Sequence, residues 1–387
     1  MKLFFLLTLF TFSFALHSKE ALEIYFFNVG QADSQLVIVP SGYSILIDCG
    51  DYDYDNASNT KHVAKKLEEI LGHKSIDVFV CTHFHYDHFG YGEHTGIWYL
   101  IEKEGFTVKK FIKRNVGYYN GEKLSDCNIN TIVWKYAGGV TSEMATGICY
   151  AISSKEKTKL SAVAENAHRC SRTQINPPDE GARVIVIQRD ALGVNSEDSG
   201  SPLARDSTGD NPQVNENDFS ICMRIEYGEF KYATCGDLSG LNYDSGGWKY
   251  HNVEKYVAEY MGEVDLYKVS HHGSTTSSNR VWCEATVPTV SVIPCGGGTH
   301  LPEPVPMGHL FDVGSVLYAV GDDCNQSTMR DYPDIKQMGD DVLVSVKLNG
   351  DTFTVAKASS PDDYDTYQIK KNKKAPKECT LLEGEEE

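Results

Sequence analysis

Four side chains with metal-binding chemistry lie within six residues of the sequence: His83, His85, Asp87 and His88. In an extended segment, residues two apart face the same side, so His83 and His85 can bind one ion together. Asp87 and His88 follow at a point where a helix can begin, and they can reach a second ion. Imidazole and carboxylate ligands suit two divalent ions, with zinc as the expected metal and manganese or iron as alternatives.

Two later segments also end in potential ligands. Tyr232–Asp237 is an apolar segment that ends in Gly-Asp, and a carboxylate at the end of a strand can bridge two ions. Leu266–Ser274 has the pattern of a strand that ends in two adjacent histidines, His271 and His272. Because three separate strand ends offer ligands of similar chemistry, the sequence predicts one metal site built from all of them.

The elements that must position these ligands follow from the spacing of apolar residues. Short runs rich in β-forming residues and bounded by turn residues predict strands, and apolar residues on one helical face predict helices. The expected strands are 22–29, 34–39, 43–48, 76–81, 182–188, 219–227, 230–235, 264–269, 289–294, 316–320, 341–347 and 351–356. The expected helices are 60–72 and 252–261. In α/β folds, sites gather in the loops at the carboxyl ends of strands.

The chain is expected to have three parts. Residues 1–15 have a positive start, an apolar run and small residues before a cleavage point, as in a secretory signal peptide. A membrane anchor is the alternative, although the run is short for a bilayer and no other span is expected. Residues 20–360 are expected to form one domain with a long insertion at about 91–216, and the charged residues 361–387 are expected to form a disordered tail.

Charge and cysteine content bear on the partner and the compartment. The chain has 54 acidic and 36 basic side chains and a formal net charge of -18, which disfavours a nucleic-acid partner. A secreted or lumenal location would make disulfides possible among the 11 cysteines. Four cysteines in apolar runs are expected in the core: Cys49, Cys81, Cys222 and Cys235. The expected bridge candidates are Cys127, Cys149, Cys170, Cys283, Cys295, Cys324 and Cys379.

The run His83-x-His85-x-Asp87-His88 resembles the signature of the metallo-β-lactamase superfamily. Four further motifs narrow the resemblance: Asn28–Ser34, Leu46–Gly50, Gly236-Asp237 and Lys268–Ser274. Together they are similar to the extracytoplasmic hydrolase domain of ComEC-type competence proteins and to bacterial phosphorylcholine esterases. The resemblance implies an α/β (α+β) protein, a four-layer αββα sandwich with its site at one edge of two packed sheets.

The resemblance also implies roles for individual residues. The implied metal ligands are His83, His85, Asp87, His88, Asp237 and His272. His83 and His85 would hold one ion, Asp87 and His88 the other, and Asp237 would bridge them, with His271 competing with His272 for the last position. Asp33 and Asp48 match aspartates of the motifs and are candidates for orienting the ligand histidines. Superfamily members carry an additional ligand histidine, for which His94 and His168 are available without a matching context, and His300 falls where the family places a histidine near the substrate.

A water molecule that bridges two metal ions loses a proton near neutral pH and becomes a nucleophile. The expected function is therefore that of a secreted metal-dependent hydrolase acting on a small-molecule, lipid or glycan phosphodiester. The residues expected to take part in catalysis are Asp87, Asp237 and His271, and either His271 or Lys268 is expected to assist the leaving oxygen. An extracellular nuclease is the first alternative, for which Lys109–Arg114 is the nearest basic cluster. A non-catalytic binding module on the same fold is an alternative of another class.

Overall fold

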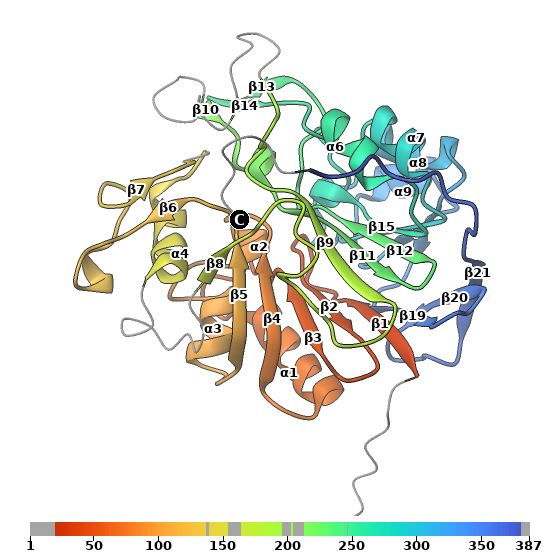
Figure 1. The fold of residues 1–387 in the computed structure, drawn as a ribbon, viewed down its shortest axis with the longest axis horizontal. Coiled ribbons are helices and arrows are strands. Elements are labelled where there is room, and N and C mark those ends of the chain that lie inside the picture. The colour runs from red at the N-terminus through yellow and green to blue at the C-terminus, as the bar shows by residue number, and fades with distance from the viewer. Residues whose placement is uncertain are drawn as a thin grey trace, which may run out of the picture.

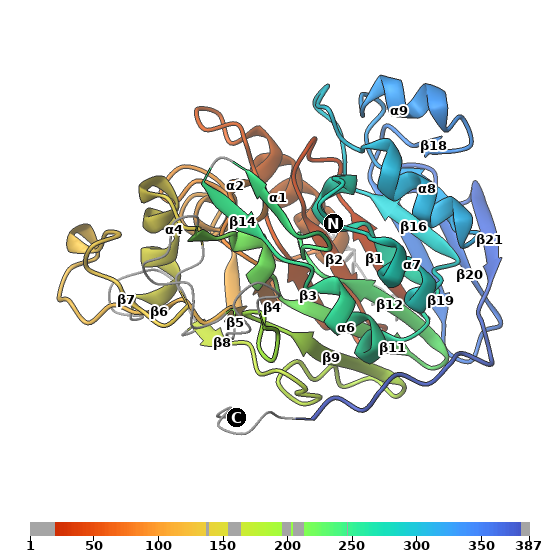
Figure 2. The same ribbon diagram turned by 90° about the horizontal axis from the view of Figure 1, so that it is seen from above.

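The computed structural model describes residues 20–136, 139–153, 164–195, 203, 213–245 and 247–380. Two β-sheets pack face to face, and helices cover the outer face of each sheet (Figure 1, Figure 2). One buried apolar cluster lies between the sheets. A second lies between the first sheet and its helices, and a third lies between the second sheet and its helices. The expected four-layer αββα sandwich is therefore confirmed. The expected signal peptide lies outside the described residues.

The first sheet has nine strands in the order β21-β20-β19-β1-β2-β3-β4-β5-β8 among the described residues. It is antiparallel from β21 to β3 and parallel from β3 to β8. Its strands are β1 Ala21–Phe26, β2 Gln35–Ile38, β3 Ser44–Ile47, β4 Ser75–Cys81, β5 Thr107–Lys113, β8 Ala164–Asn166, β19 Val342–Lys347, β20 Thr352–Lys357 and β21 Tyr364–Gln368. The helices on its side are α1 Ser58–Leu71, α2 Tyr86–Phe89, α3 Gly96–Glu102 and α4 Ser142–Ile152.

The second sheet has seven strands in the order β18-β17-β16-β15-β12-β11-β9, again among the described residues. Its strands are β9 Ala182–Gln188, β11 Cys222–Tyr227, β12 Phe230–Thr234, β15 Leu266–Lys268, β16 Val290–Ile293, β17 Val316–Ala319 and β18 Lys336–Gln337. The helices on its side are α6 Glu254–Met261, α7 Arg280–Thr286, α8 Pro304–Asp312 and α9 Gln326–Asp331. None of the helices in the described ranges is long and apolar enough to cross a membrane.

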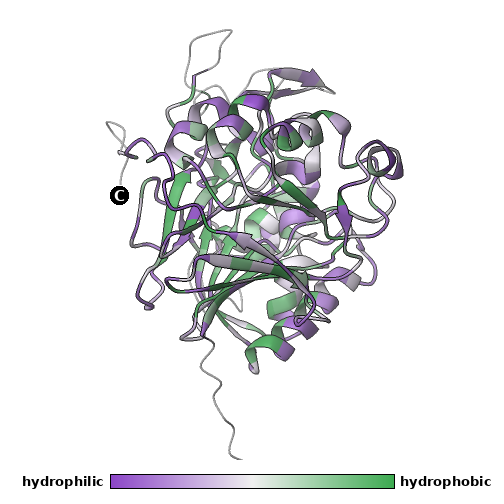
Figure 3. Cartoon of the chain, turned by 90° about the vertical axis from the view of Figure 1, so that its right-hand side faces the viewer, coloured by the Kyte–Doolittle hydropathy of each residue, from purple (hydrophilic) through white to green (hydrophobic). Residues whose placement is uncertain are grey.

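The burial of the strands follows their sequence pattern. In β19, Val342, Val344 and Val346 are buried between the sheets and alternate with more exposed residues, as expected for the two-residue period of a strand. In β2 and β3 every residue is buried, because a central strand of a sandwich is covered on both faces. Hydrophobic residues accordingly gather on the strands inside the molecule, and hydrophilic residues gather on the surrounding loops and helices (Figure 3).

Strand direction brings the candidate ligands to one edge of the sandwich. In the first sheet, Phe26 pairs with Gln35, and Gln35 pairs with Ile47, so β1 and β3 end at the same edge. β4 runs parallel to β3 and also ends there. In the second sheet, β12 and β15 are parallel neighbours, so their carboxyl ends also lie together. The loops after β1, β3, β4, β12 and β15 carry the motifs of the sequence.

The expected insertion at 91–216 includes residues that belong to the sandwich. β5, β8 and β9 fall within that range and are strands of the two sheets. β9 was expected from the sequence, but the signals of β5 and β8 were weak, because three of the seven residues of β5 are lysines and β8 is only three residues long. The segments outside the sandwich are shorter and include β6 Gly117–Tyr118 and β7 Val133–Trp134. A small sheet of β10 Gln213–Val214, β13 Tyr243–Ser245 and β14 Trp248–Tyr250 also lies outside the two large sheets, at the top of Figure 1.

The expectation of a disordered tail at 361–387 is wrong for its described part. β21 pairs with β20 at the edge of the first sheet, and Cys379 forms a disulfide with Cys170. Lys373 places its Nζ 2.9 Å from the buried Asp265 carboxylate. The tail is poor in apolar residues, but backbone pairing, a disulfide and an ion pair hold it against the domain instead. Residues 381–387 lie outside the described residues.

The structure also decides the cysteine pairing. The disulfides join Cys127 to Cys149, Cys170 to Cys379, Cys222 to Cys235, and Cys295 to Cys324. Cys49 and Cys81 are free and buried, as expected. The expectation was wrong for Cys222 and Cys235, which lie on adjacent antiparallel strands, because apolar flanking residues do not show which cysteines face each other. Cys283 is buried and free, although it was a bridge candidate.

Candidate metal centre

Backbone hydrogen bonds join the loops that carry the candidate ligands. Asp33 donates its N–H to the Asp87 carbonyl at 2.7 Å, and Gly50 donates to the Asp33 carbonyl at 2.9 Å. Cys49 donates to the carbonyl of His88 at 2.8 Å. A Cβ atom added to Gly50 would lie 1.8 Å from the Asp87 carbonyl oxygen, so only glycine permits this close approach. The Ile-Asp-Cys-Gly motif therefore fixes the position of the histidine loop.

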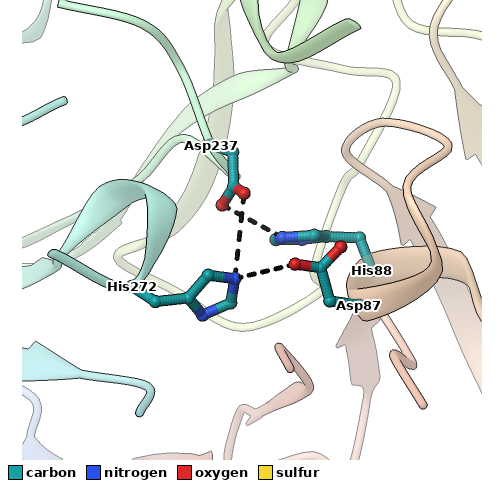
Figure 4. Close-up of side chains that lie close together, drawn as sticks. All are labelled: Asp87, His88, Asp237 and His272. Carbon is teal, nitrogen blue, oxygen red and sulfur yellow. Dashed lines mark hydrogen bonds and ion pairs between the residues drawn. The ribbon is translucent and has the colours of Figure 1, made fainter. Parts of the chain in front are cut away.

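Four buried side chains meet where these loops converge: Asp87, His88, Asp237 and His272. Their ligand atoms all lie within 4.8 Å of one another, a spacing that could hold a metal ion. His88 Nε2 is 3.0 Å from Asp237 Oδ1, and His272 Nε2 is 3.2 Å from Asp87 Oδ2 and 3.7 Å from Asp237 Oδ2 (Figure 4). The group takes two ligands from the start of α2, one from the end of β12 and one from the end of β15.

In both histidines of this group, the Nδ1 atom lies within hydrogen-bond distance of an oxygen atom. His88 Nδ1 lies 2.8 Å from Asp48 Oδ2, and the same carboxylate accepts the Thr82 N–H and hydroxyl at 2.7 Å each. His272 Nδ1 lies 2.8 Å from the carbonyl oxygen of Pro294. An acceptor at Nδ1 holds the proton there and leaves the Nε2 lone pair free for a metal ion. Asp48 thus has the contact expected of an orienting carboxylate.

Lys268 forms the cationic part of the same buried region. Its Nζ forms an ion pair with Asp33, donates to the Gly236 carbonyl at 2.8 Å and lies 3.9 Å from Asp237 Oδ1. Asp33 also accepts a hydrogen bond from Gln35 Nε2 at 2.8 Å and lies 4.0 Å from His88 Nδ1. Asp33 therefore acts mainly on Lys268, whereas Asp48 acts directly on His88.

His83 and His85 lie at the edge of the four-residue group. His83 is fully buried, and its Nε2 is 4.0 Å from Asp237 Oδ2 and 3.0 Å from His85 Nδ1. His85 is partly exposed and lines the cleft beside the group. The Asp237 carboxylate therefore lies within 4.0 Å of the imidazoles of His83, His88 and His272, and the His83 and His88 rings have centroids 4.1 Å apart.

The adjacent histidines His271 and His272 differ in their surroundings. Both have left-handed backbone conformations, with φ of 50° and 52°, which costs about 1–3 kcal/mol for each residue that is not glycine. His272 is fully buried within the four-residue group. His271 lines the cleft, with Nδ1 2.7 Å from Thr276 Oγ1 and Nε2 3.8 Å from Asp237 Oδ2. This turn places one imidazole inside the group and the other at its entrance.

The donor set fits a metal ion. Asp237 Oδ2 is buried without a hydrogen-bond partner among the described residues, and His88 Nε2 faces Asp237 Oδ1 at 3.0 Å without the geometry of a good hydrogen bond. Leaving such groups unsatisfied in the interior costs free energy, and a cation would satisfy both. Imidazole nitrogens and carboxylate oxygens are ligands of zinc and of other divalent transition metals.

Electrostatics favours positive charge at the same place. Burial lowers the pKa of His88, but the carboxylates of Asp237, Asp48 and Asp87 outweigh this and hold it well above its usual value. Burial raises the pKa of Asp237, but His88 and its neighbours outweigh this and hold it well below its usual value. Burial also lowers the pKa of His83, so this imidazole is neutral, as a ligand must be. Mutually stabilised carboxylates and imidazoles are the surroundings that a divalent cation requires.

A cleft of about 470 Å³ opens onto this group. Asp87, Asp237, His85 and His271 lie at its base. Two separate segments contribute to its walls, with Thr141 and Met144 from the α4 region and Asn217 and Trp248 from the region of β10 and β14. The cleft gives a small molecule access to the candidate metal ligands.

Sequence analysis missed the buried ion pair that supports the histidine loop. Glu216 accepts the Phe84 N–H at 3.0 Å and the Arg114 Nε–H at 2.7 Å, and both charged side chains are fully buried. Arg114 stands at the end of the basic cluster that was considered for the nuclease alternative. A fully buried arginine requires a carboxylate partner, but nothing in the sequence pairs it with Glu216 at a separation of 102 residues.

Three other histidines considered from sequence do not join the group. His94 stacks on Tyr54 with ring centroids 4.0 Å apart. His168 donates its backbone N–H to the Gln174 side chain, and His300 is exposed, with its carbonyl bound by Asn325. None of them belongs to either group of candidate metal ligands found in the described part of the chain.

No protein-family model and no curated protein matches the sequence. Among solved structures, the chain is similar to CmlA, a diiron β-hydroxylase from Streptomyces venezuelae, with 13% identity, a TM-score of 0.33 and coverage of 72% of this chain and 45% of that one. It is similar to a diphosphatase from the PhnP family, with 12% identity, a TM-score of 0.37 and coverage of 85% and 98%. A long-form RNase Z from yeast has 13% identity, a TM-score of 0.35 and coverage of 82% and 43%. The chain spans about half the length of the β-hydroxylase structures, at 48% and 45%.

Proposed function

We propose that this chain is a metal-dependent hydrolase of phosphodiesters that binds two divalent ions, with zinc as the expected metal. The observation that carries the proposal is the buried group of Asp87, His88, Asp237 and His272 at the base of an open cleft. His83, whose Nε2 lies 4.0 Å from Asp237 Oδ2, and His85, which contacts His83, would supply ligands of the second ion. When bound, the two ions supply positive charge to the phosphoryl oxygens and lower the pKa of a water molecule.

The chain's own residues then have separate tasks. Asp48 and the Pro294 carbonyl orient His88 and His272, and Asp237 contacts the imidazoles of both His83 and His88. His271 lines the cleft within 3.8 Å of Asp237, where it can hydrogen-bond the leaving oxygen. Lys268 is fully buried behind Asp237, so it balances carboxylate charge and does not touch the substrate.

The alternatives receive less support. A nuclease needs basic side chains along its nucleic-acid groove, and no lysine or arginine lines the cleft in the described ranges. Lys109 forms an ion pair with Asp77, and Arg114 is buried with Glu216, so the basic cluster expected from sequence does not form a groove. A non-catalytic binding module on the same fold would be expected to have lost metal ligands, and Asp87, His88, Asp237 and His272 are all present.

A secreted or lumenal location is part of the proposal. Four disulfides join cysteines in the described residues, and disulfides persist in oxidising compartments. The resemblance to ComEC-type hydrolase domains and phosphorylcholine esterases points the same way, since both act outside the cytoplasm.

The test is hydrolysis of bis-p-nitrophenyl phosphate with zinc or manganese added to the purified protein. We expect Asp237→Ala to reduce kcat/KM at least about 1,000-fold, because one carboxylate serves both ions. Asp312→Ala, which changes an exposed carboxylate far from the cleft, is the control and should retain the rate. Full activity of Asp237→Ala, or no hydrolysis by the wild-type protein with either metal, would refute the proposal.

A further inference from the structure

The cleft above the metal ligands has walls of aromatic rings. Its lining contains five of them: Tyr52, Tyr86, Tyr91, Trp248 and Tyr250. Tyr86 and Tyr91 stack on each other with ring centroids 4.0 Å apart. Trp248 and Tyr250 are two residues apart in β14, so their side chains project from the same face of the strand. Aromatic side chains from separate segments of the chain therefore line the cleft, and such a lining suits a ligand that is itself a ring.

The cleft is also without a fixed cationic side chain. Among the described residues, its charged lining consists of the carboxylates Asp87 and Asp237, and the remaining polar lining consists of imidazoles, hydroxyls and amides. A substrate with several phosphates would find only the metal ions as positive partners. The part of the substrate that lies beyond the reacting phosphate is therefore not anionic.

Two amide side chains in the cleft have unsatisfied oxygens. Gln31 Oε1 and Asn217 Oδ1 are buried, and neither has a hydrogen-bond partner among the described residues. Asn217 is 1% exposed, and its Nδ2 lies 3.4 Å from His271 Nε2. Leaving a buried polar atom unsatisfied costs free energy, so a ligand that turns these amides toward the cleft and satisfies both oxygens gains affinity.

These two amides discriminate between ligands. A quaternary ammonium group has no hydrogen to donate, and neither does an ionised phosphate. A hydroxyl group both donates and accepts hydrogen bonds. It can therefore pair with a side-chain amide whether the amide oxygen or the amide nitrogen faces the ligand. The C–H edges of a saturated ring can also lie against the negative face of an aromatic ring.

We propose that the organic group of the phosphodiester substrate is an uncharged, hydroxylated saturated ring, such as a sugar. Its hydroxyls bind Gln31 and Asn217, and its faces lie against Trp248 and the tyrosines of the cleft. This inference rests on the proposed phosphodiesterase function. Tyr52 adjoins the reacting end, because its hydroxyl contacts Asp87 while its ring remains 48% exposed at the mouth of the cleft.

The test compares four p-nitrophenyl phosphodiesters that share one leaving group, with methanol, glucose, choline or thymidine as the second alcohol. In each reaction water adds to phosphorus, the bond to p-nitrophenolate breaks, and the phosphate monoester of the second alcohol remains. We expect kcat/KM for the glucose ester to exceed that for the methyl ester about 10-fold or more, since two hydrogen bonds of about 1 kcal/mol are gained. The choline ester should show no such advantage.

Substitutions in the cleft test whether its residues cause the preference for the glucose ester. Asn217→Ala and Trp248→Ala should each lower the ratio of the glucose rate to the methyl rate several-fold, and Trp248→Phe should restore most of the ratio. Tyr364→Ala removes an exposed ring from β21 and should leave the ratio unchanged. Preference for the choline or thymidine ester, or equal rates for glucose and methyl esters, would overturn the inference and leave the proposed hydrolase standing. If the protein cleaved none of the four esters, both the inference and the proposed hydrolase would be overturned.

Discussion

At the scale of single residues, the candidate centre depends on what lies behind its ligands. Asp48 and the Pro294 carbonyl each bind the Nδ1 of a ligand histidine, which directs Nε2 toward Asp237. Lys268 compensates the charge of Asp33 and Asp237 without reaching the cleft. The site is therefore preorganised by hydrogen bonds that do not involve a metal ion.

Lys268→Met should destabilise the protein, because it leaves the Asp33 carboxylate buried without its cation. Breaking a buried pair in this way costs about 3–5 kcal/mol. The measurement is urea unfolding in the presence of a chelator, so that metal binding does not contribute. Adding Asp33→Asn to Lys268→Met should recover part of the loss, and strict additivity of the two changes would contradict the pairing.

Sequence analysis could predict most of the candidate ligands but not how they are arranged. The motif spacing named Asp87, His88 and Asp237, and the structure brings them within 4.8 Å of one another with His272. The choice between His271 and His272 depends on two consecutive left-handed residues, which the printed sequence does not reveal. The role of Lys268 depends on burial behind Asp237, which strand periodicity alone does not show.

At the scale of elements, the site is a meeting of loops from both sheets. Most of the expected strands are present, because alternating or continuous apolar runs determine which faces are buried. β5, β8 and the walls of the cleft were missed, because their strands are short or rich in lysine and their contacts are made by distant segments. Glu216 illustrates this point, since it joins a loop before β11 to the histidine loop after β4.

Glu216→Ala should destabilise the protein and weaken catalysis together. Arg114 would lose its bidentate partner in a fully buried position, which costs about 3–5 kcal/mol. The Phe84 N–H would lose its acceptor, so the loop that carries His83 and His85 would no longer be fixed. Urea unfolding and hydrolysis of bis-p-nitrophenyl phosphate measure the two effects.

The matched control is the exposed pair of Arg280 and Asp312, whose side chains are 57% and 56% exposed. Asp312→Ala should change the free energy of unfolding by no more than about 0.5–1 kcal/mol, because solvent screens surface pairs. An effect of Glu216→Ala as small as that of Asp312→Ala would show that the Arg114 pair does not support the loop.

At the scale of the whole molecule, the C-terminal segment is bound to the outside of the sandwich. The disulfide between Cys170 and Cys379 spans 209 residues and holds that segment beside β9. Composition predicted a disordered tail, since few apolar residues are available for burial there. Composition does not register backbone pairing in β21 or a covalent bond, and the prediction failed for that reason.

The stability of the fold should depend on pH through Glu254. Burial raises the pKa of this carboxyl to about 8, although the N–H groups of Asn279 and Ser278 oppose the shift. A carboxyl whose pKa is higher in the folded state stabilises the fold while it is protonated, and this stability is lost as pH rises from about 4.3 through about 8. We expect Glu254→Gln to gain stability relative to the wild type over that range, by up to about 1.4 kcal/mol per pH unit. A constant difference between the two proteins from pH 5 to pH 8, measured by urea unfolding, would contradict this.

The central claim is that Asp237 joins two groups of ligands into one centre for divalent ions. The most direct test is the metal content of the purified protein, measured by elemental mass spectrometry. The protein is first equilibrated with zinc, and free metal is then removed. Two ions per chain are predicted for the wild type and for Asp312→Ala, and fewer than one for Asp237→Ala. Two ions in Asp237→Ala, or none in the wild type, would contradict the account.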